Sequence, residues 1–470
     1  MMTSRDGGPI RAVLVSTYEL GHQPFGMASP TAWLRAAGAS VVGIDLAVAQ
    51  WDDDAVRTAD MVAFYLPMHT ATRIAAQWIP RARELNPDAY VCAYGLYAPM
   101  NADLLRELGV RLVIGGEFEE ALCAVVTALA RGADPADVVT DEISLRRQDF
   151  VVPDRTGLPP LSSYAYLTMP EGTRRVVGYT EATRGCKHVC RHCPVVPIYG
   201  GKFRVVPRDV VLADIEQQVE AGAQHVTFGD PDFLNGPTHA LGIVTALHER
   251  FPTLSYDATI KIEHLNKHRD LLPVLRDTGC ALITSAVEAV DEQILTIFDK
   301  HHTRADFAAV VAALLDVGIP LNPTFVAFTP WTSLTGYLDF LAEIRRLGLV
   351  GNVAPVQYAI RLLIPAGSKL LDLPDVVDLV QPFDREKLYY PWVHPDPRVD
   401  ELQQEVFALV QKGSGRSRTE LFGQVWRAAA DRAGQRAGMT MPDESVAVPQ
   451  LSEPWYCCAE PTELQLAPPV

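Results

Sequence analysis

Three cysteines, Cys186, Cys190 and Cys193, lie within eight residues of one another in the sequence C-K-H-V-C-R-H-C. The C-x3-C-x2-C spacing requires residues 186–193 to form one loop that directs three thiolates at a common centre. Three thiolates can each bind one iron of a [4Fe–4S] cluster, and the fourth iron is then open to a substrate or cofactor. The triplet therefore predicts a metal-cluster loop that the rest of the chain has to surround.

A structural zinc site is the main alternative use of this loop, because His188 and His192 lie among the cysteines. Zinc ligands usually occur as two pairs separated by a longer loop, and no second pair lies near in sequence. A disulfide framework does not fit eight cysteines in 470 residues that show no secretory signal. We therefore expect a reduced, cytoplasmic protein.

Composition excludes two classes of partner. A formal net charge of −16 argues against a nucleic-acid backbone, which needs clustered lysine and arginine. No apolar run approaches the roughly 18 residues of a membrane span, so we expect no membrane partner. A hydrophobic content of 48% over 470 residues predicts two or three domains with large cores.

Residues 1–134 alternate apolar runs with helical patterns. Runs that are apolar almost throughout are typical of strands covered on both faces. The alternation predicts a doubly wound, Rossmann-like parallel α/β sheet whose ligands lie at the carboxyl ends of the strands. Ser29 and Pro30 predict the start of the first helix. The expected strands are 12–16, 41–45, 61–66, 89–94 and 111–114, and the expected helices are 30–37, 70–85, 101–107 and 117–131.

Residues 135–175 are rich in proline, aspartate and arginine and are interpreted as a connector. Residues 176–370 hold six further β/α units, which predict an open six-stranded partial TIM barrel, (β/α)6, with its chemistry at the carboxyl ends of the strands. Residues 371–470 predict a helical C-terminal extension over the barrel mouth. The expected barrel strands are 176–180, 225–228, 255–260, 281–285, 320–328 and 354–360, and the expected helices are 208–221, 238–249, 265–277, 303–317, 334–347, 398–412 and 419–436.

The stretch from T-R-G-C at 183–186 to C-P at 193–194 resembles the signature of the radical S-adenosylmethionine (SAM) enzymes. The resemblance implies that the amino and carboxylate groups of SAM chelate the open iron. An electron from the cluster then breaks a sulfonium C–S bond of SAM. His192 occupies the position of a large aromatic residue in that family, and its flat imidazole is implied to stack near the adenine.

Further SAM contacts are implied residue by residue. Asp230 or Asp232, after the second barrel strand, would accept hydrogen bonds from the SAM amino group, unless the pair is an ordinary Asp-Pro turn. Glu288 resembles the glutamate of a Gly-x-Glu-Ser segment near the SAM ribose and carboxylate. Lys300 resembles the lysine of an Asn-Lys-x-x-Thr stretch and would pair with a carboxylate of SAM or substrate. A solvated glutamate and a helix-end lysine are the structural alternatives.

Residues 1–134 resemble the cobalamin-binding domain of one radical SAM subgroup. The loop after the first strand lacks the Asp-x-His-x-x-Gly motif that supplies a cobalt ligand, and His22 stands alone there. Two alternatives stay open: cobalamin is bound without a histidine ligand, or the domain keeps the fold without the cofactor.

A second cysteine site, Cys457–Cys458, lies in the tail C-C-A-E-P. Adjacent thiols can form a strained disulfide, bind a soft metal or metalloid, or react as thiolates, or they can be incidental features of a chain end. The tail resembles that of the CUAEP/CCAEP-tail radical SAM proteins, in which selenocysteine can replace the second cysteine. That group is similar to the arsinothricin biosynthesis radical SAM enzyme, which implies a catalytic role for both thiols.

The sequence thus predicts a radical SAM enzyme that binds a [4Fe–4S] cluster and SAM. We expect it to modify a small-molecule or peptide substrate by methyl or aminocarboxypropyl transfer, with a flavodoxin- or ferredoxin-like electron donor. A zinc-stabilised binding protein and an iron–sulfur electron-transfer protein are the rival interpretations.

Overall fold

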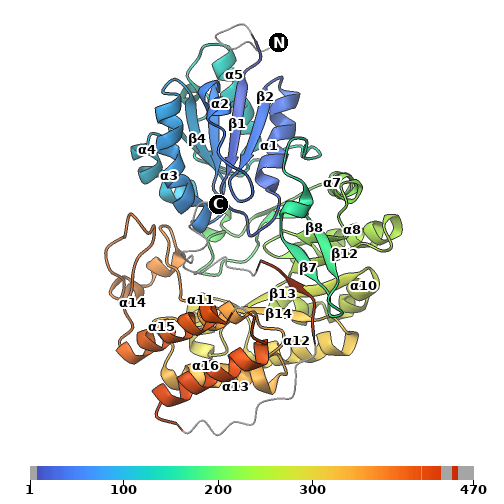
Figure 1. Cartoon of the computed structure of the whole chain (residues 1–470), viewed down its shortest axis with the longest axis vertical. Helices are drawn as coiled ribbons and strands as arrows, with labels where there is room; N and C mark the ends of the chain where they lie inside the picture. Colours follow the sequence, from blue (N-terminus) through green and yellow to red (C-terminus); the bar gives the residue numbers. More distant parts are fainter. Residues whose placement is uncertain (1–7, 414, 436–446, 454–470) are drawn as a thin grey trace.

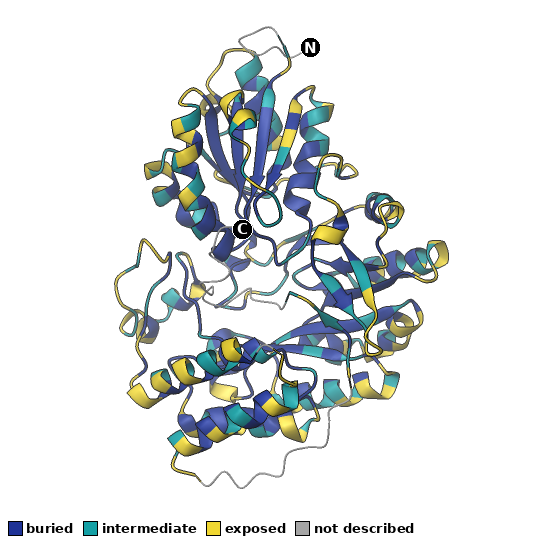
Figure 2. Ribbon diagram, in the orientation of Figure 1, coloured by how far each residue is buried: buried dark blue, intermediate teal, exposed yellow. Residues whose placement is uncertain are grey.

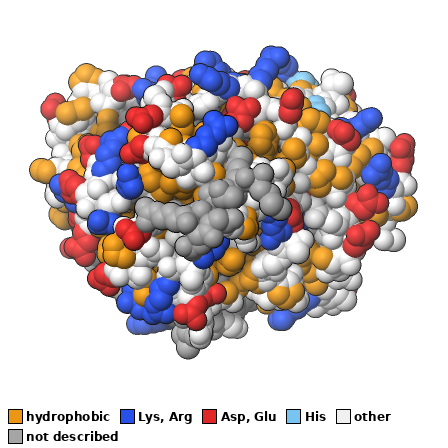
Figure 3. All heavy atoms as spheres, turned by 90° about the horizontal axis from the view of Figure 1, so that it is seen from above, with side chains coloured by type: hydrophobic (Ala, Val, Ile, Leu, Met, Phe, Trp, Pro, Cys, Tyr) orange, Lys and Arg blue, Asp and Glu red, His pale blue; other side chains and the backbone are white. Residues whose placement is uncertain are grey.

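The computed structural model describes residues 8–413, 415–435 and 447–453, so Cys457 and Cys458 lie outside the described residues. Two α/β bodies stack along the long axis, and the C-terminal helices lie beside the second body (Figure 1). Acidic and basic side chains are interspersed on the face seen from above (Figure 3). Among the described residues, no helix combines the length and apolar character needed to cross a membrane.

The predicted doubly wound sheet is confirmed. Its strands run in the order β2-β1-β3-β4-β5-β6, and all neighbours pair in parallel. Strand β2 is added on one side of β1 and β3 on the other, so the order in which strands are added reverses between β1 and β3. In such sheets the ligand crevice lies at the carboxyl ends of the strands beside this reversal. The strands are β1 (Arg11–Ser16), β2 (Ser40–Asp45), β3 (Met61–Tyr65), β4 (Tyr90–Tyr94), β5 (Leu112–Gly116) and β6 (Ile143–Ser144).

Helices cover both faces of this sheet, and the strands between them are buried (Figure 2). One apolar cluster joins the sheet to α1 (Phe25–Ala36) and α5 (Glu119–Ala130). A second cluster joins the other face to α2 (Asp53–Arg57), α3 (His69–Leu85) and α4 (Ala102–Glu107).

The predicted start of α1 at Ser29 and Pro30 is wrong, because the helix begins at Phe25 and contains Pro30. A proline inside a helix has no N–H for the carbonyl four residues earlier. Here that carbonyl, Gly26 O, accepts a hydrogen bond from the Tyr94 hydroxyl at 2.8 Å instead. This contact satisfies the carbonyl that Pro30 leaves without a backbone partner, so the helix can begin before the proline and continue through it.

The partial barrel is also confirmed as the second body. Its sheet has the order β14-β13-β12-β11-β8-β7-β15, with parallel pairing from β8 to β14 and antiparallel pairing at the β7 edge. The segment 135–175 reaches both sheets, because β6 and β7 lie in it. The strands are β7 (Tyr166–Thr168), β8 (Arg174–Thr180), β11 (His225–Phe228), β12 (Ser255–Thr259), β13 (Cys280–Glu288), β14 (Leu321–Phe325) and β15 (Gln450–Leu451).

The predicted sixth strand at 354–360 is wrong. Residues Pro355–Tyr358 form a 3-10 helix, and a single parallel bridge between Phe328 and Arg361 takes the sixth position. Pro355 cannot donate to a strand ladder. The side chain of Gln357 instead accepts the hydrogen bond of the Phe325 amide at 2.8 Å, in place of a strand carbonyl.

The outer helices pack on the barrel through one apolar core. The helix predicted at 303–317 is α12: Thr303 caps it by a capping box with Asp306, and Gly318 ends it in the left-handed conformation. The predicted helix 265–277 is divided near His268 into two helices. The last two helices pack on α13 and on Pro355–Tyr358 (Figure 1). The helices are α6 (Val196–Tyr199), α7 (Arg208–Glu220), α8 (Pro237–Arg250), α9 (Ile262–Lys267), α10 (Leu272–Asp277), α11 (Glu292–Phe298), α12 (Arg304–Val317), α13 (Leu334–Arg346), α14 (Pro374–Val377), α15 (Pro397–Lys412) and α16 (Arg418–Arg432).

Candidate active site

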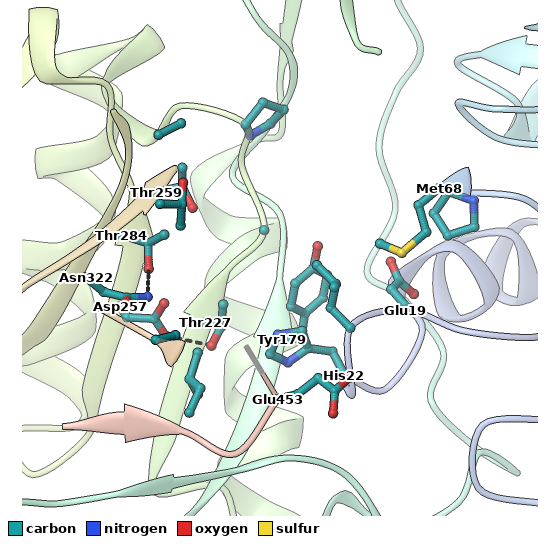
Figure 4. Close-up of a pocket in the computed structure, with 18 of the residues that line it drawn as sticks. Glu19, His22, Met68, Tyr179, Thr227, Asp257, Thr259, Thr284, Asn322 and Glu453 are labelled. Atoms are coloured by element: carbon teal, nitrogen blue, oxygen red, sulfur yellow. Dashed lines mark hydrogen bonds between the residues drawn. The ribbon is translucent and has the colours of Figure 1, made fainter. Parts of the chain in front are cut away.

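A cavity of about 750 Å³ lies between the two bodies, where the carboxyl ends of both parallel sheets face each other. The loops after β1, β3 and β4 line one side, and the strands of the barrel with the cysteine loop line the other. Figure 4 shows part of this pocket, with Glu19 and Met68 on the N-terminal side and Asp257, Thr259 and Thr284 on the barrel side.

The cysteine loop lies between β9 (Thr183–Gly185) and β10 (Phe203–Val205), which pair in antiparallel fashion. Gly185 has a φ of +75°, and a Cβ there would lie 2.3 Å from the Tyr199 ring, so glycine is required before the first cysteine. Cys186 and Cys190 are buried, and Cys193 is partly buried. The loop therefore presents all three sulfurs on the barrel side of the cavity.

The spacing of the ligand atoms disfavours a zinc site made by the three cysteines. Tetrahedral zinc with Zn–S bonds of about 2.3 Å places two sulfurs roughly 3.8 Å apart. Among the described residues, the ligand atoms that gather within 4.8 Å of one another belong to Cys186, His188 and Asp232, not to the cysteine triplet. The wider triplet suits a larger polynuclear cluster.

Two buried lysines approach the cysteine loop. Lys261 Nζ lies 3.6 Å from Cys190 Sγ, and its side chain is 7% exposed. Burial alone would lower the pKa of Lys300, but Glu288 and the sulfurs of Cys190 and Cys193 raise it. Both ammonium groups can stabilise the negative charge of bound thiolates. Sequence reasoning missed Lys261, although its place directly after β12 was a usable signal.

Burial raises the pKa of the Cys186 thiol to about 11. Without a metal this side chain is therefore a neutral thiol at neutral pH. Binding of a metal ion to Cys186 would displace this proton and would therefore be favoured by raising the pH.

The structure brings together His192, Glu288 and Lys300. Glu288 Oε1 lies 3.1 Å from His192 Nε2 and 3.4 Å from Lys300 Nζ. Burial alone would raise the pKa of Glu288, but Lys300 and His192 outweigh it and hold the pKa at about 2. Glu288 also has a φ of +70°, a strained conformation that is common at functional sites. The ring of His192 packs on Phe298, with centroids 4.5 Å apart.

The two aspartates after β11 have structural partners. Asp230 accepts hydrogen bonds from the Thr183 hydroxyl at 2.5 Å and the Ala182 amide at 3.0 Å, and burial raises its pKa to about 6. Asp232 Oδ2 lies 2.6 Å from His264 Nδ1 and 3.4 Å from His188 Nε2. Asp230 thus shapes the start of the cysteine loop, while Asp232 orients His188 within it. Their proposed contact with SAM stays a prediction.

The loop after β1 closes on the barrel. His22 stacks on Tyr179 of β8, with ring centroids 4.7 Å apart, and burial lowers its pKa to about 4. Burial raises the pKa of the Glu19 carboxyl well above its usual range, and the Tyr65 hydroxyl donates to it at 3.4 Å. Among the described residues, this loop holds one histidine, and it is engaged with the barrel (Figure 4).

Arg184 ties the cysteine loop to the N-terminal body. It donates to Glu181 at 2.7 Å and to Glu119, at the start of α5, at 2.9 Å, and it lies 3.3 Å from Glu117. Its side chain is 6% exposed, and the rings of Phe25, Phe118 and Phe150 surround the guanidinium at 5.1 to 5.5 Å. The position of the cluster loop is therefore fixed relative to both sheets.

The C-terminal segment 447–453 completes the cavity wall. Strand β15 pairs with β7, and the Tyr18 hydroxyl donates to Glu453 at 2.5 Å.

Comparison with known proteins identifies the barrel. Residues 180–331 match the model of the radical SAM superfamily. Threonylcarbamoyladenosine tRNA methylthiotransferase MtaB from Aquifex aeolicus (strain VF5) is 21% identical over 250 residues. That alignment covers 52% of this chain and only 57% of the relative.

Two solved structures share the architecture of nearly the whole chain. The radical SAM methyltransferase TsrM from Kitasatospora setae, with cobalamin and a [4Fe–4S] cluster bound, superposes with a TM-score of 0.65 at 14% identity. The match covers 90% of this chain and 99% of that one. The cobalamin-dependent radical SAM enzyme OxsB, with aqua-cobalamin and SAM bound, gives a TM-score of 0.65 at 12% identity over 86% and 67% of the chains. The two-body fold is thus that of cobalamin-dependent radical SAM enzymes.

Proposed function

We propose that Cys186, Cys190 and Cys193 hold a [4Fe–4S] cluster and that SAM fills the adjacent part of the cavity, because residues 180–331 match the radical SAM superfamily and the fold is that of TsrM. When bound, the cluster supplies the electron that cleaves a C–S bond of SAM. The observation that supports this most is the buried cysteine loop at the carboxyl ends of the barrel strands, beside two buried lysines.

The roles of the surrounding residues follow from their contacts. Lys261 and Lys300 offset negative charge near the cysteines, and Glu288 orients Lys300 and His192. We expect Lys300 to bind the carboxylate of SAM and Glu288 to accept hydrogen bonds from the ribose of SAM. The burial of these groups excludes water from the reacting bond, which strengthens each electrostatic contact.

The proposed substrate is a small molecule or a peptide that enters the rest of the cavity, and the transferred group is methyl or aminocarboxypropyl. TsrM and OxsB bind cobalamin. In this chain the histidine of the loop after β1, His22, is stacked on Tyr179. Cobalt analysis of anaerobically purified protein decides whether the N-terminal body binds the cofactor without a histidine.

Anaerobic reconstitution with iron and sulfide, followed by SAM and a strong reductant, tests the proposal. We expect about three to four irons per chain and release of a nucleoside. 5′-Deoxyadenosine indicates a 5′-deoxyadenosyl radical, and methylthioadenosine indicates aminocarboxypropyl transfer. A reduced flavodoxin or ferredoxin should replace the chemical reductant. Zinc without iron, or an iron–sulfur protein that leaves SAM intact, would contradict the proposal.

We expect Glu288→Gln to raise the KM for SAM by about 10- to 100-fold, the worth of a charge-assisted hydrogen bond. The substitution keeps the size of the side chain but removes the charge that holds Lys300 and His192 in place. Steady-state rates at varied SAM measure the effect. Glu249→Gln, on an exposed position of α8, should leave the KM unchanged, and equal KM values in both variants would count against a role of Glu288 in SAM binding.

We further propose that Cys457 and Cys458 act on the substrate. Two adjacent thiols form a soft chelate for trivalent arsenic. We expect the reconstituted protein, in which iron occupies the thiolates of Cys186, Cys190 and Cys193, to bind about one arsenite per chain and its Cys458→Ser variant to bind none. Cys123→Ser, which removes a thiol of α5, is the matched control and should bind arsenite normally. Equal stoichiometry in all three proteins would show that the tail thiols are not a binding site.

A further inference from the structure

The inner surface of the barrel is polar where such barrels are usually filled by branched apolar residues. Side chains alternate across a strand, so every second residue faces the lumen. Val226, Tyr256 and Ile283 belong to the apolar core beneath the outer helices. Their alternates line the cavity instead, and they are Thr227, Asp257, Thr259, Thr284, Asn322 and Thr324.

The strand registers place these polar residues side by side. Thr227 lies opposite Asp257, Thr259 lies opposite Thr284, and Thr284 lies opposite Asn322. Asn322 donates to the Thr284 hydroxyl at 3.2 Å (Figure 4). A continuous row of hydroxyl and amide groups thus crosses four strands.

Asp257 is the charged member of this row and is only 3% exposed. Its Oδ1 accepts from the Thr227 hydroxyl at 2.6 Å and lies 2.8 Å from His225 Nε2. Among the described residues, no side chain forms a hydrogen bond or ion pair with its Oδ2. Figure 4 shows the carboxylate among the residues that line the pocket.

A chain of hydrogen bonds holds Asp257 in place. His225 lies between Asp257 and Ser255, with Nε2 2.8 Å from Asp257 Oδ1 and Nδ1 2.7 Å from Ser255 Oγ. Ser255 Oγ itself accepts from Arg175 at 2.7 Å. Burial lowers the pKa of His22, the other nearby imidazole, to about 4, so that ring is neutral at neutral pH.

Several cations line the cavity. Lys261 and Lys300 lie with the cysteines, and Arg418 donates to the carbonyls of Gly351 and Asn352. Among the described residues, none of these three cations forms an ion pair with Asp257. Asp257 lies deeper in the barrel, near the stacked rings of His22 and Tyr179 (Figure 4). A buried carboxylate with one oxygen outside any hydrogen bond is costly unless a ligand supplies the positive charge.

We propose that the lumen is a subsite for a cationic amine or guanidinium group of the substrate, with Asp257 as its counter-ion. The hydroxyl and amide groups of Thr227, Thr259, Thr284 and Asn322 bind the polar atoms beside that group. The inference rests on the proposed function, since it assumes that the substrate occupies this cavity, and it narrows the substrate class to amine-bearing polar molecules.

Calorimetric titration of the reconstituted enzyme, saturated with SAM, tests the subsite. The probes are 1,4-diaminobutane and 1,4-butanediol, which match in shape and differ in charge. We expect the wild-type enzyme to bind the diamine at least about tenfold more tightly than the diol, the least that a charge-assisted hydrogen bond contributes. Asp257→Asn should reduce this preference to less than about twofold, whereas Asp316→Asn, at an exposed position of α12, should retain it.

A second variant keeps the test decisive if Asp257→Asn does not fold. Asn322→Asp adds a carboxylate to the same row and should tighten diamine binding. Equal binding of both probes by the wild-type enzyme, or an unchanged preference in Asp257→Asn, would overturn the subsite. SAM cleavage is scored separately: its absence refutes the proposed function even if the diamine binds, and its presence without a diamine preference refutes only the subsite.

Discussion

Replacing Cys190 by alanine should abolish the iron–sulfur absorption of the reconstituted protein and lower the rate of SAM cleavage at least about 1000-fold. The remaining two thiolates cannot hold a cluster that needs three protein ligands. The change also leaves Lys261 Nζ without the sulfur that now lies 3.6 Å away. Iron content and visible absorption measure the loss of the cluster, and nucleoside release measures the loss of SAM cleavage.

Cys123→Ala is the matched control, because this thiol lies on α5 and burial raises its pKa to about 11. It should retain full iron content and full SAM cleavage. Near-normal cleavage in Cys190→Ala would show that the cysteine loop is not the cluster site. Normal iron content without cleavage would instead separate cluster binding from the reaction.

Arg184→Met should lower the free energy of unfolding by about 3–5 kcal/mol, the cost of removing one partner from a buried ionic network. The substitution keeps much of the apolar contact with the three phenylalanine rings but leaves Glu119 and Glu117 without their buried cation. Urea denaturation measures the loss. Arg398→Met, which breaks a surface ion pair with Asp396, should leave the midpoint nearly unchanged.

The deficit of Arg184→Met should grow as the pH rises. Burial already raises the pKa of Glu181 from 4.5 to about 7 in the presence of Arg184. Without the guanidinium, the carboxyls of the network bind protons more tightly in the folded than in the unfolded state. Their stabilising effect is then present at low pH and is lost as the pH rises through the folded-state pKa. A larger deficit at pH 5 than at pH 8 would contradict this account of the network.

Strong periodic signals explain how much of the fold was predictable. The strand at His225–Phe228 and the helix predicted at 303–317 depend on local residue order, and both were predicted correctly. The errors at Pro30 and at residues 354–360 have one cause. In each case a side chain replaces a backbone hydrogen bond. The Tyr94 hydroxyl donates to the carbonyl that Pro30 cannot serve, and the Gln357 side chain accepts from the Phe325 amide in place of a strand carbonyl.

The residues of the site also divide into those that local spacing predicts and those that only the fold brings together. The spacing of Cys186, Cys190 and Cys193 predicts their joint role, because the ligands of one cluster are close in sequence. Lys261 and Asp257 carry no comparable local pattern. Their importance comes from what they face across the barrel: a cysteine sulfur in one case, and a row of hydroxyl groups in the other.

The sequence by itself determined the class of this protein, since hydrophobic periodicity and cysteine spacing are short-range properties that one chain displays. The tertiary structure decided what surrounds the cluster loop. It placed Arg184 against Glu117 and Glu119 of the other body, and it bonded Asp230 to the backbone at the start of the cysteine loop. It also left one oxygen of Asp257 without a hydrogen-bond partner among the described residues. Contacts between residues far apart in sequence depend on how two sheets meet, and no local pattern encodes that meeting.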